Sequence, residues 1–371
     1  MKILLLGDYS NLHACLATGL RRMGHDAAVA SDGGGFMNTE YTLSLRRSLP
    51  GPAGGAFLFA KMLWSGVFRG YDVVSIISPA FATLRPARLR QVFRMLRRHN
   101  GAVFLNAAGT DKAFMDMVLS DRSPLQYNEY FLSPGNPNHA NDAVLRADTR
   151  WREGEIGRWC DEVYSGVNGI TTALYEYHKA FELLGTGVPL EYVGIPVDLQ
   201  SVKPIDRILA ADGKVNLFLG RHSHRKAFKG TDVLERVARR VVAENPERSS
   251  LEIVENLPYA EYVKRMRSAD VVIDQLYSYT PATNALLAMA AGQAVVSGGE
   301  EEYYRFIGEE KLRPIINVVP DEERIHGILT SAVQNPEDIR NRGAQGREFV
   351  ERHNSVDKVA DRSVKFWEAN S

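Results

Sequence analysis

The stretch that decides the fold is KILLLGDYSN, at residues 2–11. Residues 2–6 form a short continuous apolar run, which is typical of a strand buried on both faces of a parallel sheet. Ser10 stands where it can cap a helix that we expect over residues 11–23. A second strand is expected at residues 25–30. This strand–helix–strand order predicts a parallel βαβ unit.

The same alternation continues along the chain. Helices are expected over residues 86–99, 232–244, 259–267 and 281–291, and strands over residues 71–77, 102–106, 215–219, 251–255, 271–276 and 294–297. The sequence therefore predicts an α/β fold made of two Rossmann-like domains that face each other across a cleft. The expected domains span residues 1–197 and 198–352, and a last helix at 353–371 packs back onto the protein.

Length and composition agree with this architecture. A chain of 371 residues is long enough for two domains. The 45 Lys and Arg balance the 45 Asp and Glu, which argues against a generally basic nucleic-acid-binding protein. Two cysteines, Cys15 and Cys160, exclude a cysteine-rich zinc site and favour a reduced chain. No apolar run suits a signal peptide or a membrane span, so we expect a cytoplasmic protein.

Several catalytic motifs are missing from the sequence. The first turn lacks the G-x-G-x-x-G spacing of dinucleotide-binding folds, and the chain has no P-loop, no H-E-x-x-H, no Asp-x-Asp and no G-x-S-x-G. We therefore expect neither a bound metal nor a tightly bound cofactor.

Two loops in the second half carry the chemistry that remains. The first, GRHSHRKAFKG at residues 220–230, holds four Lys or Arg and two His after an expected strand. Such a loop would neutralise a diphosphate and donate hydrogen bonds to its oxygens, although a solvated basic surface loop is an equal alternative. Loops that follow parallel strands emerge at the edge of the sheet where ligands bind.

The second loop is QLYSYTPATN at residues 275–284, and it opens into an alanine-rich helix. Thr280 suits the cap of that helix and Pro281 suits its first turn. The free amides at the start of this helix would suit a phosphate. A well-capped buried helix is the alternative, and it leaves the hydroxyl-rich entrance unexplained.

Residues 220–234 and 269–296 resemble the donor-binding segments of the B-type-fold (GT-B) nucleotide-sugar glycosyltransferases, especially the retaining family four. Gly24-His25-Asp26 and the segment 194–198 are also similar to that family, and the resemblance covers nearly the whole chain. It points to a divergent bacterial branch that builds surface polysaccharide. The family usually has two glutamates where this chain has Tyr279 and Leu287.

The resemblance implies roles for individual residues. Arg221 and Lys229, with Lys226 nearby, would bind the donor diphosphate and stabilise its charge during transfer. Glu255 would lie near the nucleobase. The phosphates and the sugar would be held by Ser278, Tyr279, Thr280, Thr283 and Asn284. The acceptor side would be formed by Gly7, Ser10, Asn11 and His13.

Asp111, after the expected strand at 102–106, is our candidate for an acid, base or charge-stabilising group. Its alternative role is to cap a helix or turn. His13 is a second candidate, although a lone histidine on a helix is more often structural.

Residues 1–100 hold 13 Lys and Arg against 5 Asp and Glu. The arginines of the expected helix at 86–99 form either a solvated face or a peripheral contact with anionic lipid, and the apolar stretch 57–68 is consistent with the second interpretation. Such contact would bring the protein to a lipid-linked acceptor at the inner face of a membrane.

The sequence therefore predicts transfer of a sugar from a nucleotide-diphosphate sugar to a hydroxyl of a saccharide or lipid-linked saccharide. The setting would be bacterial polysaccharide or glycolipid synthesis, with retention more expected than inversion and no nucleic acid as a partner. The alternatives are a nucleotide-sugar epimerase or hydrolase, a non-catalytic sugar-nucleotide-binding protein, and a two-lobed solute-binding protein.

Overall fold

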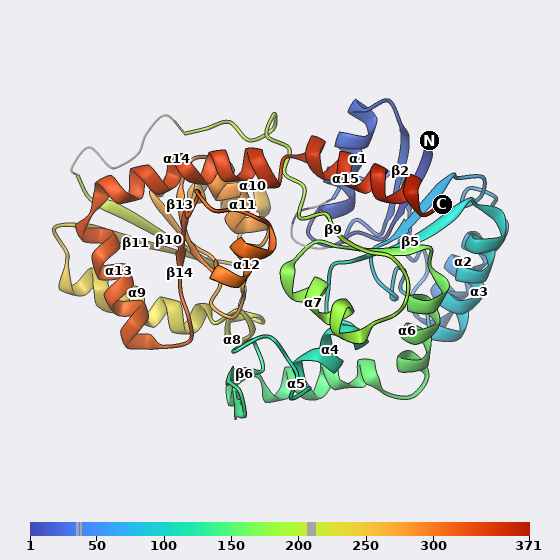
Figure 1. Ribbon diagram of the computed structural model, residues 1–371, viewed down its shortest axis with the longest axis horizontal. Coiled ribbons are helices and arrows are strands. Elements are labelled where there is room, and N and C mark those ends of the chain that lie inside the picture. Colours follow the sequence, from blue (N-terminus) through green and yellow to red (C-terminus); the bar gives the residue numbers. More distant parts are fainter. Residues whose placement is uncertain (35–36, 38, 206–212) are drawn as a thin grey trace. The chain divides into compact units, whose positions relative to one another are not determined.

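The computed structural model describes residues 1–34, 37, 39–205 and 213–371 (Figure 1). The chain divides into two compact units. The first unit contains Met1–Ser123, Arg146–Asp198 and Val356–Ser371, and the second contains Pro124–Leu145 and Leu199–Ser355. The chain passes from the first unit to the second after Asp198. The segment Pro124–Leu145 differs from the expectation, because it packs with the second unit.

The first unit is built on a seven-stranded sheet in which every pairing is parallel. Its order is β3 (Leu43–Ser44), β2 (Asp26–Ser31), β1 (Lys2–Leu6), β4 (Val73–Ile76), β5 (Ala102–Ala107), β8 (Gly169–Thr172) and β9 (Leu190–Tyr192). The strand order reverses between β1 and β4, which is the point where open α/β sheets bind ligands.

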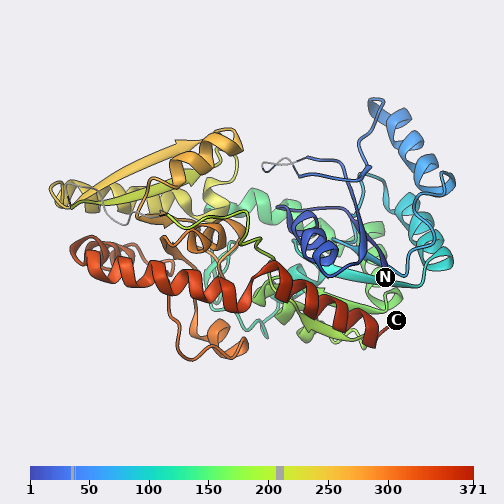
Figure 2. The same cartoon turned by 90° about the horizontal axis from the view of Figure 1, so that it is seen from above.

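The first unit also contains helices. They are α1 (Leu12–Arg22), α2 (Gly51–Trp64), α3 (Pro86–His99), α4 (Lys112–Val118), α6 (Gly154–Gly166), α7 (Tyr175–Leu184) and α15 (Val356–Ala369). Figures 1 and 2 show α15 beside α1. A Cβ added at Gly19 of α1 would lie 2.8 Å from the carbonyl oxygen of Val356, so the two helices need glycine there. The expected return of the C-terminal helix onto the protein is confirmed.

The second unit contains a five-stranded sheet that is also wholly parallel. Its order is β11 (Ser249–Glu255), β10 (Val215–Arg221), β12 (Val271–Ile273), β13 (Ala294–Ser297) and β14 (Ile315–Asn317). Its helices are α8 (Lys226–Lys229), α9 (Thr231–Glu244), α10 (Tyr259–Met266), α11 (Thr283–Ala290), α12 (Glu301–Phe306), α13 (Glu322–Gln334) and α14 (Pro336–His353). The strand order reverses between β10 and β12.

The remaining elements lie between residues 131 and 152. They are the antiparallel pair β6 (Phe131–Ser133) and β7 (Asn136–Pro137), the helix α5 (Asp142–Asp148), and the 3-10 turns His139–Asn141 and Thr149–Arg152. No helix in the described ranges is both long enough and apolar enough to cross a lipid bilayer.

Two rows of apolar side chains explain why the strands form where the sequence predicts them. Val215, Leu217 and Leu219 of β10 lie in one core with residues of α9 and α13, and Ile3 and Leu5 of β1 lie in another with α1 and α15. The strands are buried on both faces, so their sequences are continuously apolar. The prediction of an α/β fold with two Rossmann-like sheets is confirmed.

Two predicted helix starts are wrong. Ser10 does not cap α1; Asn11 is the N-cap residue and makes no side-chain cap, while Asp8 accepts from the backbone nitrogen of His13 at 2.9 Å. Helix α11 begins two residues later than expected, so Thr280 cannot be its cap. In both places the chain makes a turn that local helix signals do not encode.

Candidate functional site

Arg221 is the last residue of β10, at the carboxyl end of the second unit's sheet. Its register partner is Glu255, the last residue of β11. Arg221 Nε lies 2.7 Å from Glu255 Oε2, and Arg221 Nη1 donates to Glu235 of α9. Two carboxylates therefore hold this guanidinium at the sheet edge and balance its charge. Glu255 is exposed.

Lys229 closes the loop that follows β10. Its Nζ lies 3.8 Å from Asp274 Oδ1, and its carbonyl oxygen accepts from the backbone nitrogen of Leu276 at 2.9 Å. Gly230 has a φ of 68°, and a Cβ there would lie 2.7 Å from Leu276 Cβ, so the backbone turn needs glycine. An ion pair and a backbone hydrogen bond thus connect the basic loop to the loop after β12. Lys226 is exposed.

Asp274, directly after β12, is a residue that the sequence analysis missed. Only 2% of it is exposed. Asn284 Nδ2 donates to Asp274 Oδ1 at 3.2 Å, and Tyr262 Oη donates to Asn284 Oδ1 at 2.8 Å. Asp274 therefore joins Lys229 to the first turn of α11. An acidic residue that directly follows a buried strand was the signal available in the sequence.

Three buried oxygens near this place have no hydrogen-bond partner in the described part of the chain. They are Asp274 Oδ2, Ser278 Oγ and Ser297 Oγ. Buried polar atoms in native proteins are nearly always paired, so these oxygens retain the capacity to accept a further hydrogen bond.

The structure buries three of the five predicted donor residues, and Ser278 is one of them. Tyr279 is 3% exposed, its hydroxyl accepts from the backbone nitrogen of Gln126 at 2.5 Å, and its ring lies 5.1 Å from that of Tyr127. Thr280 is also buried. Thr283 and Asn284, at the start of α11, remain partly exposed. Of the five side chains predicted to hold the phosphates and the sugar, only Thr283 and Asn284 are therefore accessible.

A carboxylate beside Tyr279 comes from a different part of the sequence. Glu300 precedes α12, and its Oε1 accepts from Tyr127 Oη at 2.8 Å and from Asn317 Nδ2 at 3.0 Å. The backbone nitrogen of Glu300 donates to the Tyr279 carbonyl at 3.2 Å. The chain thus brings an acidic group next to a position where the resembled family has glutamate. No motif in the sequence marked it.

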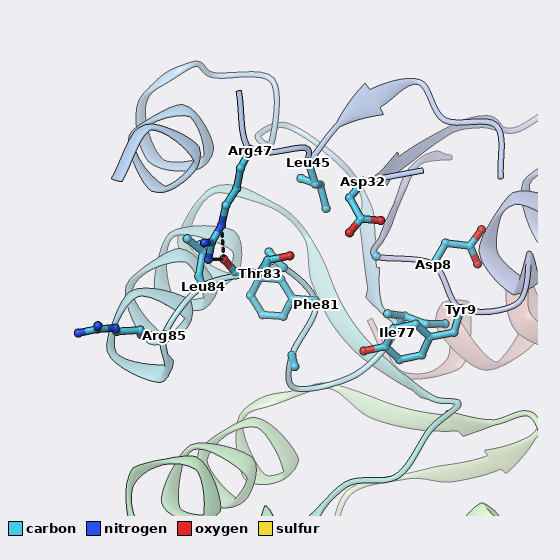
Figure 3. Close-up of a pocket in the computed structure, with 13 residues that line it drawn as sticks. Asp8, Tyr9, Asp32, Leu45, Arg47, Ile77, Phe81, Thr83, Leu84 and Arg85 are labelled. Carbon is cyan, nitrogen blue, oxygen red and sulfur yellow. Dashed lines mark hydrogen bonds between the residues drawn. The ribbon is translucent and has the colours of Figure 1, made fainter. Parts of the chain in front are cut away.

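The first unit has a cavity of about 460 Å³ at the carboxyl ends of β1, β2 and β4 (Figure 3). Its wall consists of Gly7, Asp8, Tyr9, Asp32, Leu45, Arg47, Ile77, Ala80, Phe81, Ala82, Thr83, Leu84 and Arg85. Gly7 has a φ of 80°, and a Cβ there would lie 2.5 Å from Ile77 Cγ2. The turn after β1 therefore needs glycine, because of its backbone conformation and the close approach of Ile77.

The cavity has an acidic and a basic part. Figure 3 shows Asp8 and Asp32 on one side and Arg47 and Arg85 on the other. Burial raises the pKa of Asp8 to about 6, although backbone nitrogens donate to its carboxylate. Arg47 Nε donates to the carbonyl oxygen of Thr83 at 3.1 Å. Such a wall suits a polar ligand with hydroxyl groups and an anionic group.

Of the four predicted acceptor residues, only Gly7 lines the cavity. Ser10 and Asn11 adopt positive φ angles of 51° and 65° and shape the turn before α1. His13 is fully buried, with Nδ1 2.7 Å from the Gly7 carbonyl oxygen, and burial lowers its pKa to about 4. His13 is therefore a neutral core residue that supports the turn.

Asp111 is the N-cap of α4. Only 2% of it is exposed, its Oδ1 accepts from the Phe114 backbone nitrogen at 3.1 Å, and burial raises its pKa to about 6. Its side chain also bonds to Tyr164. The structure thus bears out the capping alternative, and a catalytic role for Asp111 stays a prediction.

Within the described residues, no three His, Cys, Asp or Glu side chains gather as metal ligands.

This sequence matches no established protein-family profile and no curated protein. Solved structures resemble the whole chain. Sucrose-phosphate synthase from Thermosynechococcus elongatus is 12% identical with a TM-score of 0.61, covering 100% of this chain and 99% of its own. Anabaena HepE, in complex with UDP and glucose, is 11% identical with a TM-score of 0.59 and full coverage of both chains.

WaaG, a glycosyltransferase involved in lipopolysaccharide biosynthesis, is 10% identical with a TM-score of 0.54, covering 99% of each chain. At such identities the similarity concerns architecture alone. The protein has the GT-B fold of two Rossmann-like units, as the sequence predicts.

Proposed function

We propose that this protein is a glycosyltransferase that moves a sugar from a nucleotide-diphosphate sugar to a hydroxyl acceptor. The observation that carries the proposal is the placement of Arg221 and Lys229 on the loop after β10, in a GT-B fold, with Lys229 fastened to the start of α11 through Asp274. Cations and helix amides at the carboxyl edge of a parallel sheet suit a diphosphate. This part of the proposal needs only the second unit.

The donor would exchange partners with the protein. Its phosphates would take the place of Glu255 and Glu235 on Arg221, and of Asp274 beside Lys229. Both cations would then stabilise the negative charge that builds on the departing diphosphate. Fixed side-chain cations would do the work of a metal, so the proposed reaction is metal-independent. Thr283, Asn284 and the unpaired oxygens of Asp274 and Ser278 are proposed sugar contacts.

Two carboxylates are proposed for the acceptor side. Asp8 lines the first unit's cavity and has a pKa near the pH at which a group can both accept and donate a proton. Asp111 is kept as the second candidate. We propose a retaining outcome from the family resemblance alone. The two glutamates typical of that family are replaced in this chain by Tyr279 and Leu287.

The setting we propose is bacterial polysaccharide or glycolipid synthesis, with a saccharide or lipid-linked saccharide as acceptor. WaaG, whose chain is covered almost completely, acts in lipopolysaccharide biosynthesis, which supports this setting. HepE is bound to UDP and glucose, which supports a uridine nucleotide as the first donor to test. A cytoplasmic protein in peripheral contact with the inner face of a membrane completes the proposal.

A thermal-shift panel of nucleotide sugars tests the donor. A ligand at a hundred times its Kd stabilises the folded state by about 2.7 kcal/mol, so a true donor raises Tm by several degrees. Nucleotide release is then measured with and without saccharide acceptors. Release that depends on an acceptor supports transfer. Release without one indicates a hydrolase, conversion of the sugar indicates an epimerase, and binding without turnover indicates a binding protein.

A further inference from the structure

Helix α2 presents an apolar stripe to solvent. Ala53, Phe57, Ala60 and Trp64 recur at intervals of three or four residues, the spacing of one helix face. Trp64 is 73% exposed and Phe57 is 54% exposed. Seven large apolar side chains are exposed in the described residues, and four of them lie between Leu49 and Val67. Such concentration marks an interaction surface, since scattered single residues would need no explanation.

The opposite face of α2 is held in the first unit. Its buried residues are Gly54, Gly55, Leu58 and Met62. Figures 1 and 2 show α2 and α3 side by side, and the Arg88 guanidinium of α3 lies 5.5 Å from the centre of the Phe59 ring. The stripe is therefore the outer side of a docked helix, presented in a defined orientation.

The surroundings of α2 are strongly cationic. Residues 41–110 hold ten Lys and Arg and a single acidic residue, Asp72. Arg90 pairs with Glu155 and Glu162, and the other nine cations have no carboxylate within ion-pair distance among the described residues. They are Arg46, Arg47, Lys61, Arg69, Arg85, Arg88, Arg94, Arg97 and Arg98.

Several of these cations lie against α2. A Cβ added at Gly55 would be 3.3 Å from Arg88 Nη1 and 3.7 Å from Arg47 Cζ. Lys61 Nζ donates to the Ser44 carbonyl at 2.7 Å, and Arg69 Nη2 donates to the Leu63 carbonyl at 2.6 Å. Aromatic side chains and unpaired cations thus share one surface.

We propose that α2 and α3 form a docking surface for an anionic phospholipid bilayer, with Phe57 and Trp64 entering its interface. Tryptophan favours the headgroup region, and unpaired Lys and Arg are attracted to anionic lipids. A second copy of the chain is the poorer occupant, because it would bring two sets of nine unpaired cations together. An anionic bilayer matches both features of the surface, because its interface takes up apolar side chains and its headgroups attract Lys and Arg.

The docking surface continues into the cavity of the first unit. Arg47 lies against Gly55 of α2 and also lines the cavity with Arg85 (Figure 3). On a bilayer, this basic end would face lipid phosphates and the acidic end, with Asp8 and Asp32, would face the sugar of a lipid-linked acceptor. This last step rests on the proposed sugar transfer, whereas the docking itself deepens the proposed membrane contact and rests on α2 and α3 alone.

Vesicle co-sedimentation tests the docking. The probes are vesicles of phosphatidylcholine alone and of phosphatidylcholine mixed with phosphatidylglycerol. We expect binding to the mixed vesicles only, and its loss at 0.5 M salt, where the Debye length is well below its ~8 Å physiological value. Trp64→Ala should weaken binding about tenfold through lost apolar burial. Arg94→Glu with Arg98→Glu should weaken it at least about tenfold.

Matched controls separate docking from general effects. Met23→Ala removes another exposed apolar side chain, 41% exposed, and Arg340→Glu reverses an exposed arginine on α14. Both should bind mixed vesicles as the unchanged protein does. Trp64 and the two arginines are exposed, so each variant should keep its Tm within about 2 °C.

Three outcomes would overturn the proposal. They are the absence of binding to mixed vesicles, equal binding by Trp64→Ala and Met23→Ala, and a dimer in analytical ultracentrifugation that Trp64→Ala dissociates. Transfer to a water-soluble acceptor should be the same for Trp64→Ala and the unchanged protein. A protein that binds vesicles but transfers no sugar would contradict the proposed function and leave the docking surface standing.

Discussion

Two buried carboxylates of the first unit differ from two carboxylates of the second in the groups that lie beside them. In the first unit, no cation of the described residues contributes to the pKa of Asp8 or Asp111, and burial raises the pKa of each to about 6. In the second unit, Glu309 accepts from His353 and Arg352, and Glu322 pairs with Arg236. The pKa of both glutamates is lowered. Burial without a cation favours the protonated form, and pairing favours the charged form.

The cations of residues 41–110 and those of α9 also differ in whether they have a carboxylate partner. Nine Lys and Arg in residues 41–110 of the first unit lack a carboxylate partner among the described residues. The arginines on α9 of the second unit, Arg236, Arg239 and Arg240, all have one. Charges that are paired within the protein hold side chains in place, whereas unpaired charges are available to something outside it. We therefore expect the two units to differ in how they bind anions and in how their stability changes with pH.

The largest effect should come from Arg221→Ala combined with Lys229→Ala. If these paired cations of the second unit serve a diphosphate, the double variant should lose at least about a hundredfold in affinity for the nucleotide sugar found in the thermal-shift panel. A hydrogen bond to a charged group contributes about 1.5–3 kcal/mol, and two such contacts are lost. Isothermal titration calorimetry measures the change.

Arg239→Ala is the matched control for this variant. Arg239 also pairs with Glu235, at 2.9 Å, but its side chain is 62% exposed on α9. It should leave donor affinity unchanged. Equal losses in Arg221→Ala and Arg239→Ala would move the donor site away from the end of β10.

The next effect should come from Glu309→Gln, which tests how far the second unit depends on pairing. Only 3% of Glu309 is exposed; it accepts from His353 Nε2 at 2.7 Å, Arg352 Nη1 at 3.0 Å and the Leu312 backbone nitrogen at 3.0 Å. Loss of the charge should lower the free energy of unfolding by about 2–3 kcal/mol, since the hydrogen bonds that the buried carboxylate accepts lose their charge assistance and the amide cannot accept all of them. Urea denaturation measures it.

Glu348→Gln provides the comparison, because Glu348 also pairs with Arg352, at 2.6 Å, with its side chain 57% exposed. An exposed pair contributes about 0–1 kcal/mol, so this variant should be nearly as stable as the unchanged protein. Similar losses in the two variants would show that burial does not set the value of the Glu309 pairs.

Acid should reveal the same contrast, with a smaller effect. Asp8 and Asp111 have folded pKa values of about 6, above the unfolded value of about 3.9. Their contribution to stability is therefore fully present below about pH 4 and is lost as the pH rises through 6. Glu309 has a folded pKa of about 2, because the bonds from His353 and backbone nitrogens outweigh its burial. Its contribution is present above about pH 4.3 and is lost as the pH falls toward 2.

Hydrogen exchange at pH 4.5 and pH 7, corrected for the intrinsic rate, reports on each unit separately. We expect the protection of β1 and β5 in the first unit to rise at pH 4.5, and that of β10 and β13 in the second to change little. Asp8→Asn should remove part of the gain in the first unit, and Asp111→Asn another part. A gain that survives both substitutions would contradict the assignment of these carboxylates.

Sequence and structure agree best where the pattern is local. The apolar runs of β1 and β10 predict buried parallel strands, since a strand covered on both faces must be apolar throughout. The basic loop at 220–230 could also be predicted, because its residue types identify it. Asp8, Asp274 and Glu300 could not, since a single acidic residue in a loop is common and only its neighbours in space make it distinctive.

The inward turn of Tyr279 shows the same limit. Its partners, Gln126 and Tyr127, lie about 150 residues earlier, on a segment that the sequence assigned to the other domain. The sequence by itself determined four strands of each parallel sheet and the cationic loop, because hydrophobic periodicity and residue type act over a few neighbours. Tertiary structure alone decided which loop side chains face a cavity and which are buried, because that depends on contacts between distant segments.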